Sequence, residues 1–498
     1  MPLRRRSAKA SATTRLGLIT LLVLCGCAGV PQQEDPLARI RARGTLRWGG
    51  DMQGGEPYVF QDPEDGARLV GFEVEIADAL ARRLGVRAEF VQNDWQTLVP
   101  SLERGDFDLA LNGIEVTAAR RARVAFTRPY YAFTETLVVR RDDAAVRGLA
   151  DLQGARVGTL DGSLALDLLS QAAGIEIVRY EGVEEPYLDL EQGRLRAVLL
   201  DDIIAARYGL PRPTLRGAAA VGEGRYAIAV RPSEAALVAA VDDALGAMMA
   251  DGELRAILGR WHLWDERQAA LATERAVRPG GGGPARLTLA QLPLFLRGTW
   301  FTVVISSLAM GLAVVGGLVL GLLRRYGGAA ARTAAALYVE VFRGTPVLLQ
   351  LYVLYYGLAP VLTLDAFTAA VVGLGLNYAA YESELYRAGL DAVPVGQTEA
   401  ALSLGMSRGL TLRRIVLPQA LRVALPGMAN DFIALLKDSS LVSVITVVEL
   451  TKQMTITAVD VRGWLGPGLL CAALYLALSL PLSRLARRLE GRLGPRHA

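Results

Sequence analysis

Two stretches without any charged side chain, residues 299–323 and 465–483, constrain this chain more than any other feature. A helix needs about 20 consecutive apolar residues to cross the hydrocarbon layer of a membrane, and both stretches are close to that length or exceed it. Residues 35–275, in contrast, carry charged side chains throughout. The chain therefore combines a polar, folded half with a membrane half, which excludes both a wholly soluble protein and a disordered one.

Composition excludes several other classes of protein. The 498 residues contain only three cysteines and two histidines, which supply neither a disulfide scaffold nor a set of zinc ligands. The formal net charge of +4 is small and the basic residues are scattered, a pattern that does not favour nucleic acid as a partner. We therefore expect no metal site and no nucleic-acid partner.

Residues 1–27 have the three parts of a secretory signal, namely basic residues, a short apolar run and small residues. The apolar run at residues 16–24 is too short to cross a membrane. Leu24-Cys25-Gly26-Cys27 resembles the bacterial lipobox, in which the last cysteine becomes the lipid-modified first residue, so Cys27 is the predicted lipidation site. Ordinary cleavage nearby and an uncleaved signal are the alternatives. All three place the residues that follow outside the cytoplasm.

Residues 35–275 alternate between short strands and helices, which predicts parallel sheets covered on both faces. In such sheets ligands bind at the carboxyl ends of the strands. The apolar patterns place strands at residues 45–49, 86–91, 106–111, 157–160 and 197–200, and helices at residues 71–80 and 95–104.

Several ordered motifs in this half resemble the polar amino acid branch of the periplasmic solute-binding proteins, over residues 45–265. That resemblance implies a type II, two-lobed α/β fold whose lobes are joined by hinge strands near residues 137–140 and 226–230. The motifs are LALNGIEVTAARR at residues 109–121, VAFT at 124–127, PYY at 129–131, VGFEV at 70–74, DLQG at 151–154 and LLD at 199–201.

A zwitterionic ligand needs a cation for its carboxylate and an acceptor for its ammonium. The planar guanidinium of Arg120 can hold a carboxylate through two hydrogen bonds, and Asp201 ends an apolar strand on the other lobe. Their alternatives are a solvated charge for Arg120 and a plain helix N-cap for Asp201. The resemblance implies these same roles, and it implies further contacts at Asp51, Trp95, Gly113, Gly162 and Ser163.

Glu115 stands where many members of that family have Ser or Thr. A second carboxylate beside Asp201 favours a cationic or strongly polar amino acid if its side chain points into the site. The alternative is that Glu115 faces solvent or pairs with Arg120.

Residues 276–287 include the run PGGGGP, which is typical of a linker, and residues 288–490 form the predicted membrane domain. We expect an all-α domain of about five spans. Basic clusters follow the first span, lie between the third and fourth, and follow the fifth, which is the distribution that the positive-inside rule requires if the linker lies outside. The spans are expected at residues 299–323, 336–359, 365–390, 421–447 and 465–483.

The loop at residues 397–418 resembles the EAA loop of bacterial ATP-binding-cassette import permeases. In that family the loop docks on a cytoplasmic ATPase. The family also has a glutamate near its substrate cavity in the segment of residues 378–384, and Glu384 matches it best; an interhelical or dimer contact is the alternative for Glu384. The predicted coupling residues are Glu399, Ala400, Ala401, Gly405, Leu417 and Pro418.

The chain has no Gly-Lys pair and so no phosphate-binding loop of the Walker type, which places ATP and Mg²⁺ on another polypeptide. The resemblance implies a multi-pass protein of the cytoplasmic membrane that imports amino acids, fused to its binding domain, with an ATPase dimer and a second permease half, expected to be a homodimer, as partners. We expect no enzymatic activity and no cofactor in this chain. The alternatives are a ligand-gated channel and a dehydratase on a binding-protein fold.

Overall fold

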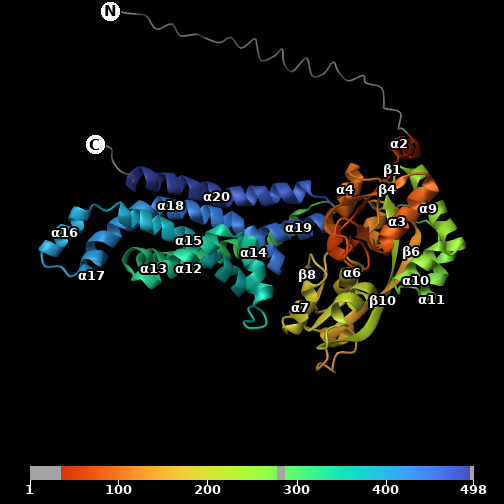
Figure 1. The fold of residues 1–498 in the computed structure, drawn as a ribbon, viewed down its shortest axis with the longest axis horizontal. Coiled ribbons are helices and arrows are strands. Elements are labelled where there is room, and N and C mark those ends of the chain that lie inside the picture. Colours follow the sequence, from red (N-terminus) through yellow and green to blue (C-terminus); the bar gives the residue numbers. More distant parts are fainter. Residues whose placement is uncertain (1–34, 277–286, 462, 494–498) are drawn as a thin grey trace, which may run out of the picture.

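The computed structural model describes residues 35–276, 287–461 and 463–493. The predicted signal peptide at residues 1–27, including Cys27, and most of the predicted linker lie outside these ranges. Figure 1 shows an α/β domain at one end of the molecule and a bundle of long helices at the other. The prediction of an α/β fold followed by an all-α domain is confirmed.

One mixed sheet of eight strands, in the order β4-β1-β5-β10-β6-β9-β7-β8, forms the centre of the α/β domain. The outer strands pair in parallel, as predicted, but β10 and β6 run antiparallel to each other along their whole length. They connect two lobes, so we call the part built on β1, β4 and β5 the first lobe and the part built on β7, β8 and β9 the second lobe. The strands are β1 (Thr45–Gly50), β4 (Arg87–Gln92), β5 (Leu109–Ala110), β6 (Ala125–Arg140), β7 (Arg156–Leu160), β8 (Glu176–Tyr180), β9 (Ala197–Asp201) and β10 (Leu215–Val230). A small separate hairpin is formed by β2 (Phe60–Gln61) and β3 (Leu69–Val70).

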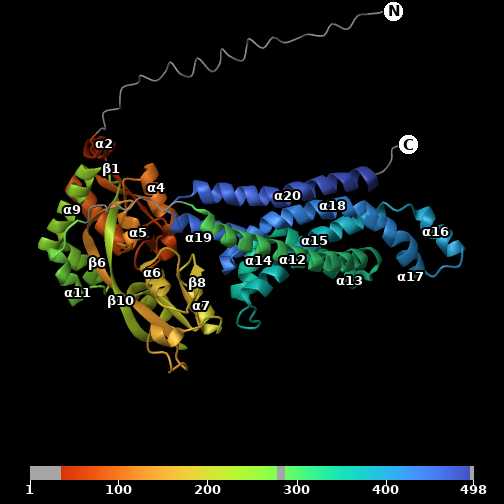
Figure 2. The same ribbon diagram turned by 180° about the vertical axis from the view of Figure 1, so that it is seen from behind.

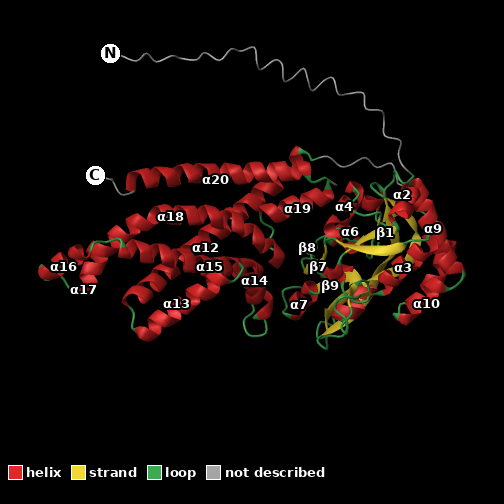
Figure 3. Ribbon diagram, turned by 45° about the horizontal axis from the view of Figure 1, so that its top comes forward, coloured by secondary structure: helices red, strands yellow, loops and turns green. Residues whose placement is uncertain are grey.

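Helices cover the sheet where apolar residues recur at helical spacing. The predicted helix at residues 71–80 is α3 (Phe72–Leu84), and the predicted apolar face, including Phe72, Ile76 and Leu80, is buried. Figure 3 shows α3 and α9 beside the strands of the first lobe. The other helices of this domain are α2 (Pro36–Arg43), α4 (Leu98–Arg104), α5 (Ala118–Arg121), α6 (Leu164–Gln171), α7 (Glu185–Glu191), α8 (Asp202–Ile204), α9 (Ala235–Ala250), α10 (Glu253–Arg260) and α11 (Glu266–Ala270).

The membrane domain is entirely helical. Among the described helices, α12 and α20 are each long and apolar enough to cross a membrane, and the bent pair of α13 with the segment that begins at α14 could form a third span. The helices are α12 (Leu292–Tyr326), α13 (Ala329–Gly344), α14 (Val347–Tyr352), α15 (Ala366–Asp391), α16 (Val395–Ser403), α17 (Arg408–Thr411), α18 (Leu417–Asp438), α19 (Leu450–Asp460) and α20 (Leu465–Leu493).

The second predicted span, residues 336–359, is not one straight helix. The chain bends by 108° between α13 and α14. Pro346 explains the bend, because its ring disfavours a helical Thr345 and it has no N–H with which to continue the hydrogen-bond ladder of α13. The predicted spans at residues 365–390 and 421–447 correspond to α15 and to α18 with the turn that follows it.

The binding domain and the predicted coupling loop lie at opposite ends of the molecule. Figures 1 and 2 both place α16 and α17 at the far end of the helical bundle, while α19 and the start of α20 lie next to the α/β domain. The helical bundle therefore separates the two regions for which the sequence predicts binding and coupling.

Candidate functional site

A cavity lies between the two lobes at the carboxyl ends of β1 and β9, where the alternation of strands and helices predicts a ligand site. Its cavity volume is about 50 Å³, and the hydrogen bond from Tyr58 to Asp201 joins the two lobes beside it. The first lobe contributes Asp51, Tyr58, Trp95, Gly113 and Glu115 to its lining, and the second lobe contributes Ser163, Glu181 and Asp201.

The structure divides the predicted binding residues between two neighbouring cavities. Asp51, Trp95, Gly113, Glu115, Ser163 and Asp201 line the cavity between the lobes. Arg120 and Gly162 instead line an adjacent cavity, which is closed on its far side by residues of α19 and by Trp464. Trp95 lines both cavities and so forms part of the wall that separates them.

Arg120 forms an ion pair with Glu115, the alternative that the sequence left open for Glu115. Its guanidinium lies 3.1 Å from the Glu115 carboxylate and 4.5 Å from the centre of the Trp95 ring. The same carboxylate oxygen accepts the N–H of Leu164, at the first residue of α6 in the second lobe, at 2.8 Å. Glu115 thus occupies donors from both lobes that could otherwise hold the carboxylate of a ligand.

Asp201 combines two roles that the sequence presented as alternatives. It ends β9, caps α8 by accepting the Ile204 N–H at 2.9 Å, and lines the cavity. Its carboxylate also accepts the hydroxyl of Tyr58 from the first lobe at 3.2 Å. Burial is the main reason that the pKa of Asp201 rises to about 6.

Glu135 is a site residue that the sequence analysis missed. It lies in β6 directly opposite Asp201 of β9, is fully buried and lines the cavity. Within the described chain, neither of its carboxyl oxygens has a hydrogen-bond partner of good geometry. Burial and then the nearby charge of Glu115 raise its pKa well above the usual range. The available signal was a lone carboxylate inside a strand in which most residues are apolar or aromatic.

Three buried carboxylates, those of Glu115, Glu135 and Asp201, therefore line the cavity, and Arg120 forms an ion pair with one of them, Glu115. Ionising such buried acids without a nearby cation costs several kcal/mol, which is why burial raises the pKa of Asp201 and of Glu135. A ligand that brings positive charge into the cavity would remove much of that cost. The site is chemically suited to an organic cation.

The buried acids predict an unusual pH dependence of stability. Burial raises the pKa of Asp201 to about 6 and that of Glu73, in the first lobe, to about 7. A carboxyl group ordinarily titrates near pH 4, so the folded state holds these protons more tightly than the unfolded state, and the stabilisation is lost as pH rises through 6 and 7. We expect the ligand-free protein to melt at a higher temperature at pH 5 than at pH 8, with about 1.4 kcal/mol arising from Asp201, whose folded pKa lies about one unit above pH 5. Tryptophan fluorescence during thermal unfolding would measure the difference, and Glu73→Gln should reduce it. A melting temperature that is higher at pH 8 would contradict it.

A third cavity, of about 490 Å³, lies in the membrane domain. Two acids of α18 and a polar face of α15 form it, whereas Glu384 is not among its lining residues. Glu384 instead pairs with Arg324 at 2.8 Å and with Arg387 at 2.9 Å. The lining residues are Arg343, Gly344, Thr345, Pro346, Val347, Asn377, Tyr378, Tyr381, Asp431, Ala434 and Asp438.

The predicted coupling residues lie in α16, just after it, and at the start of α18. Glu399, Ala400 and Ala401 belong to α16, and Gly405 follows that helix with a positive φ of 82°, a conformation that favours glycine. Leu417 and Pro418 then begin α18, where a proline is tolerated because the first helical N–H has no partner within the helix.

Two protein families match this chain. Bacterial extracellular solute-binding proteins, family 3, match residues 46–263. The family described as binding-protein-dependent transport system inner membrane component matches residues 313–495.

The similar proteins each cover only a part of this chain. The glutamine transport system permease protein GlnP of Escherichia coli is 40% identical over 209 residues, which are 41% of this chain and 94% of that protein. The arginine transport system permease protein ArtQ of Bacillus subtilis is 35% identical over 208 residues, or 41% of this chain and 95% of that protein. Among solved structures, an ancestral arginine-binding protein bound to arginine is 31% identical, with a TM-score of 0.41, covering 44% of this chain and 98% of that one.

Proposed function

This chain belongs to the family of binding-protein-dependent transport system inner membrane components, and from that premise we propose that it takes up a cationic amino acid of the arginine or lysine type. It is an amino acid ABC transporter permease with a fused solute-binding domain. The family consists of transport components of the inner membrane, so neither the channel nor the dehydratase alternative is needed.

One observation carries the choice of a cationic substrate, namely the three buried carboxylates of Glu115, Glu135 and Asp201 around the cavity. The Asp201 carboxylate binds the α-ammonium of the ligand. The Glu135 carboxylate, directly opposite Asp201, interacts with the positive charge on the side chain of the ligand. Arg120 takes the α-carboxylate after exchanging its present partner, Glu115. Released from Arg120, Glu115 then contributes a further negative charge toward the ligand. Asp51, Trp95, Gly113 and Ser163, which line the same cavity, complete the proposed contacts.

The membrane half delivers the ligand inward. The linker and binding domain lie on the outer, periplasmic side, and α16 docks through Glu399, Ala400 and Ala401 on one subunit of a separate ATPase dimer. A second copy of this chain completes the translocation pathway.

Glu384 stabilises the helices around that pathway through its ion pairs with Arg324 and Arg387. Asn377 and Asp431 line the cavity of the membrane domain. The fused binding domain stays near the permease, which replaces encounter by diffusion with a high local concentration.

Equilibrium binding to the full chain in lipid nanodiscs tests the choice of substrate. We expect radiolabelled arginine or lysine to bind at least about 100-fold more tightly than glutamine or glutamate, because close charge pairs in a desolvated site couple by about 1.5–7 kcal/mol. Glu135→Gln should lower the affinity for the cation and leave that for glutamine nearly unchanged. Tighter binding of glutamine than of arginine would refute the cationic assignment, and no binding of any amino acid would refute the amino acid assignment itself.

A further inference from the structure

The second lobe contacts the membrane domain through charged groups and an aromatic side chain. Arg194 donates to the carbonyl oxygen of Tyr355 at 3.1 Å, and its guanidinium lies 4.0 Å from the centre of the Tyr355 ring. The Tyr355 hydroxyl donates to Asp189 at 2.9 Å, and Asp189 also pairs with Arg194 at 2.8 Å. Arg194, Asp189 and Tyr355 contact one another, so they join the second lobe to the segment that follows α14.

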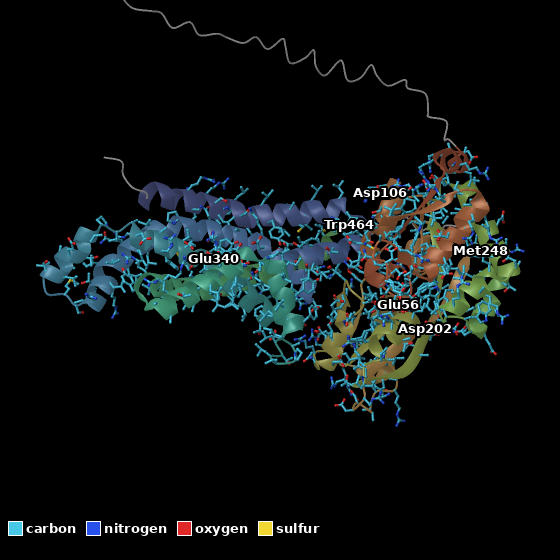
Figure 4. The ribbon with its side chains drawn as sticks, viewed as in Figure 1. Glu56, Asp106, Asp202, Met248, Glu340 and Trp464 are labelled. Atoms are coloured by element: carbon cyan, nitrogen blue, oxygen red, sulfur yellow. The ribbon has the colours of Figure 1, made fainter. Side chains whose placement is uncertain are left out.

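One contact of this interface reaches the binding cavity. Nζ of Lys452, in α19, lies 2.8 Å from a carboxylate oxygen of Glu181, and Glu181 lines the cavity between the lobes. Trp464, labelled in Figure 4 at the junction of the two domains, marks the region where the chain leaves α19. A residue of the membrane domain thus touches the wall of the binding cavity.

The burial of Lys452 makes that contact informative. Its side chain is only 2% exposed, whereas that of Glu181 is 46% exposed. A buried ammonium is costly unless it is paired, and in the described part of the chain Glu181 is the carboxylate with which Lys452 forms an ion pair. Glu181 therefore has two roles, because it forms an ion pair with Lys452 of the membrane domain and also lines the cavity in which the ligand would bind.

We propose that Lys452 is a specificity-determining residue of the binding cavity, whose ammonium competes with a cationic ligand for the carboxylate of Glu181. When the ligand is absent, Lys452 neutralises Glu181 and holds the second lobe on α19. When a cationic ligand enters, it and Lys452 both interact with the Glu181 carboxylate. The affinity of the cavity for the ligand is therefore lower while the two domains are in contact. The inference rests on the proposed cationic substrate, and it adds a residue of the permease to the binding site.

The test measures equilibrium binding of radiolabelled arginine and glutamine to the full chain in nanodiscs. Lys452→Met should tighten arginine binding about fivefold, the size expected for a partly exposed ion pair, and leave glutamine binding unchanged. In a Glu181→Gln background, adding Lys452→Met should change arginine affinity much less, because the contested carboxylate is gone. Lys452→Gln, whose amide can still donate to Glu181, is the second variant, with a smaller increase expected.

The matched control breaks another ion pair of the same interface. Asp460 lies 3.7 Å from Arg179 and lines the adjacent cavity, not the one between the lobes. Asp460→Asn should therefore leave arginine affinity unchanged. Unchanged affinity in both Lys452 variants, or the same factor with and without Glu181, would overturn the inference. Failure of the unmodified chain to bind arginine or lysine would overturn the proposed substrate, and this inference with it.

Discussion

Replacing Asp201 by asparagine is expected to weaken binding of the cationic amino acid at least about 100-fold, because truncating one partner of a buried, hydrogen-bonded charge pair costs about 2–5 kcal/mol. The carboxylate lies at the end of β9 and faces Glu135 across the β6–β9 pair. Asparagine keeps the size of the side chain and caps a helix as well as aspartate does, so the Ile204 N–H keeps its acceptor. The expected loss of affinity therefore arises from removal of the negative charge and not from loss of the helix cap.

Thermal stability separates loss of charge from loss of fold in this variant. The folded protein holds the Asp201 proton more tightly than a free carboxyl does, since burial raises its pKa to about 6. At pH 8, above this pKa, the buried carboxyl is ionised, which is unfavourable. Asp201→Asn should therefore leave the melting temperature of the ligand-free protein at pH 8 unchanged or raise it. A variant that loses binding and also melts at a lower temperature would show that Asp201 acts mainly as a structural cap.

Asp202 provides the matched control for this experiment. It is the next residue in the chain, yet it pairs with Arg267 at 2.8 Å and does not line the cavity. Figure 4 labels it on the same domain. Asp202→Asn should change ligand affinity less than about threefold, the scale of a partly exposed ion pair. A loss as large as that of Asp201→Asn would assign the effect to the net charge of the domain and not to contact with the ligand.

Local sequence patterns predicted those features that depend on local chemistry. Apolar runs located β1, β4, β7 and β9 to within a residue or two, and the helical spacing of Phe72, Ile76 and Leu80 identified the buried face of α3. The predicted strand at residues 106–111 is shorter in the structure, since β5 pairs only over Leu109–Ala110. Motif resemblance identified Asp201 and Glu115, which both line the cavity.

Features that depend on contacts between distant segments could not be predicted in the same way. Glu135 lies opposite Asp201 only because β6 and β9 pair in one particular register. Lys452 and Glu181 meet across 271 residues of sequence, and no local pattern marks either of them. The ion pair of Arg120 with Glu115 was one of the alternatives that the sequence left open for Glu115, and the structure contains that pair.

Gly317 of α12 sits against α15, and Gly317→Val is expected to prevent the membrane domain from folding. A Cβ atom at residue 317 would lie 2.5 Å from Cβ of Glu382 and 3.0 Å from the carbonyl oxygen of Ala379. The second of these is backbone, so no rotation of a side chain can relieve the clash. Overpacking costs about 1–3 kcal/mol where neighbours can adjust, and we expect more than that here. Small residues allow helix backbones to approach closely in membranes, which is the role that Gly317 fills.

Gly311, six residues earlier in α12, is a suitable control because a Cβ atom there would meet nothing within 4 Å. Both substitutions exchange glycine for valine inside the same helix, so the change in helix propensity is the same for each. Fluorescence-detected size-exclusion chromatography of detergent-extracted fusions should give a single symmetric peak for Gly311→Val and little or aggregated protein for Gly317→Val. Equal behaviour of the two variants would contradict the packing of α12 on α15. A folded Gly311→Val that no longer transports would instead indicate a contact with a neighbour outside the single chain, such as the proposed second permease half.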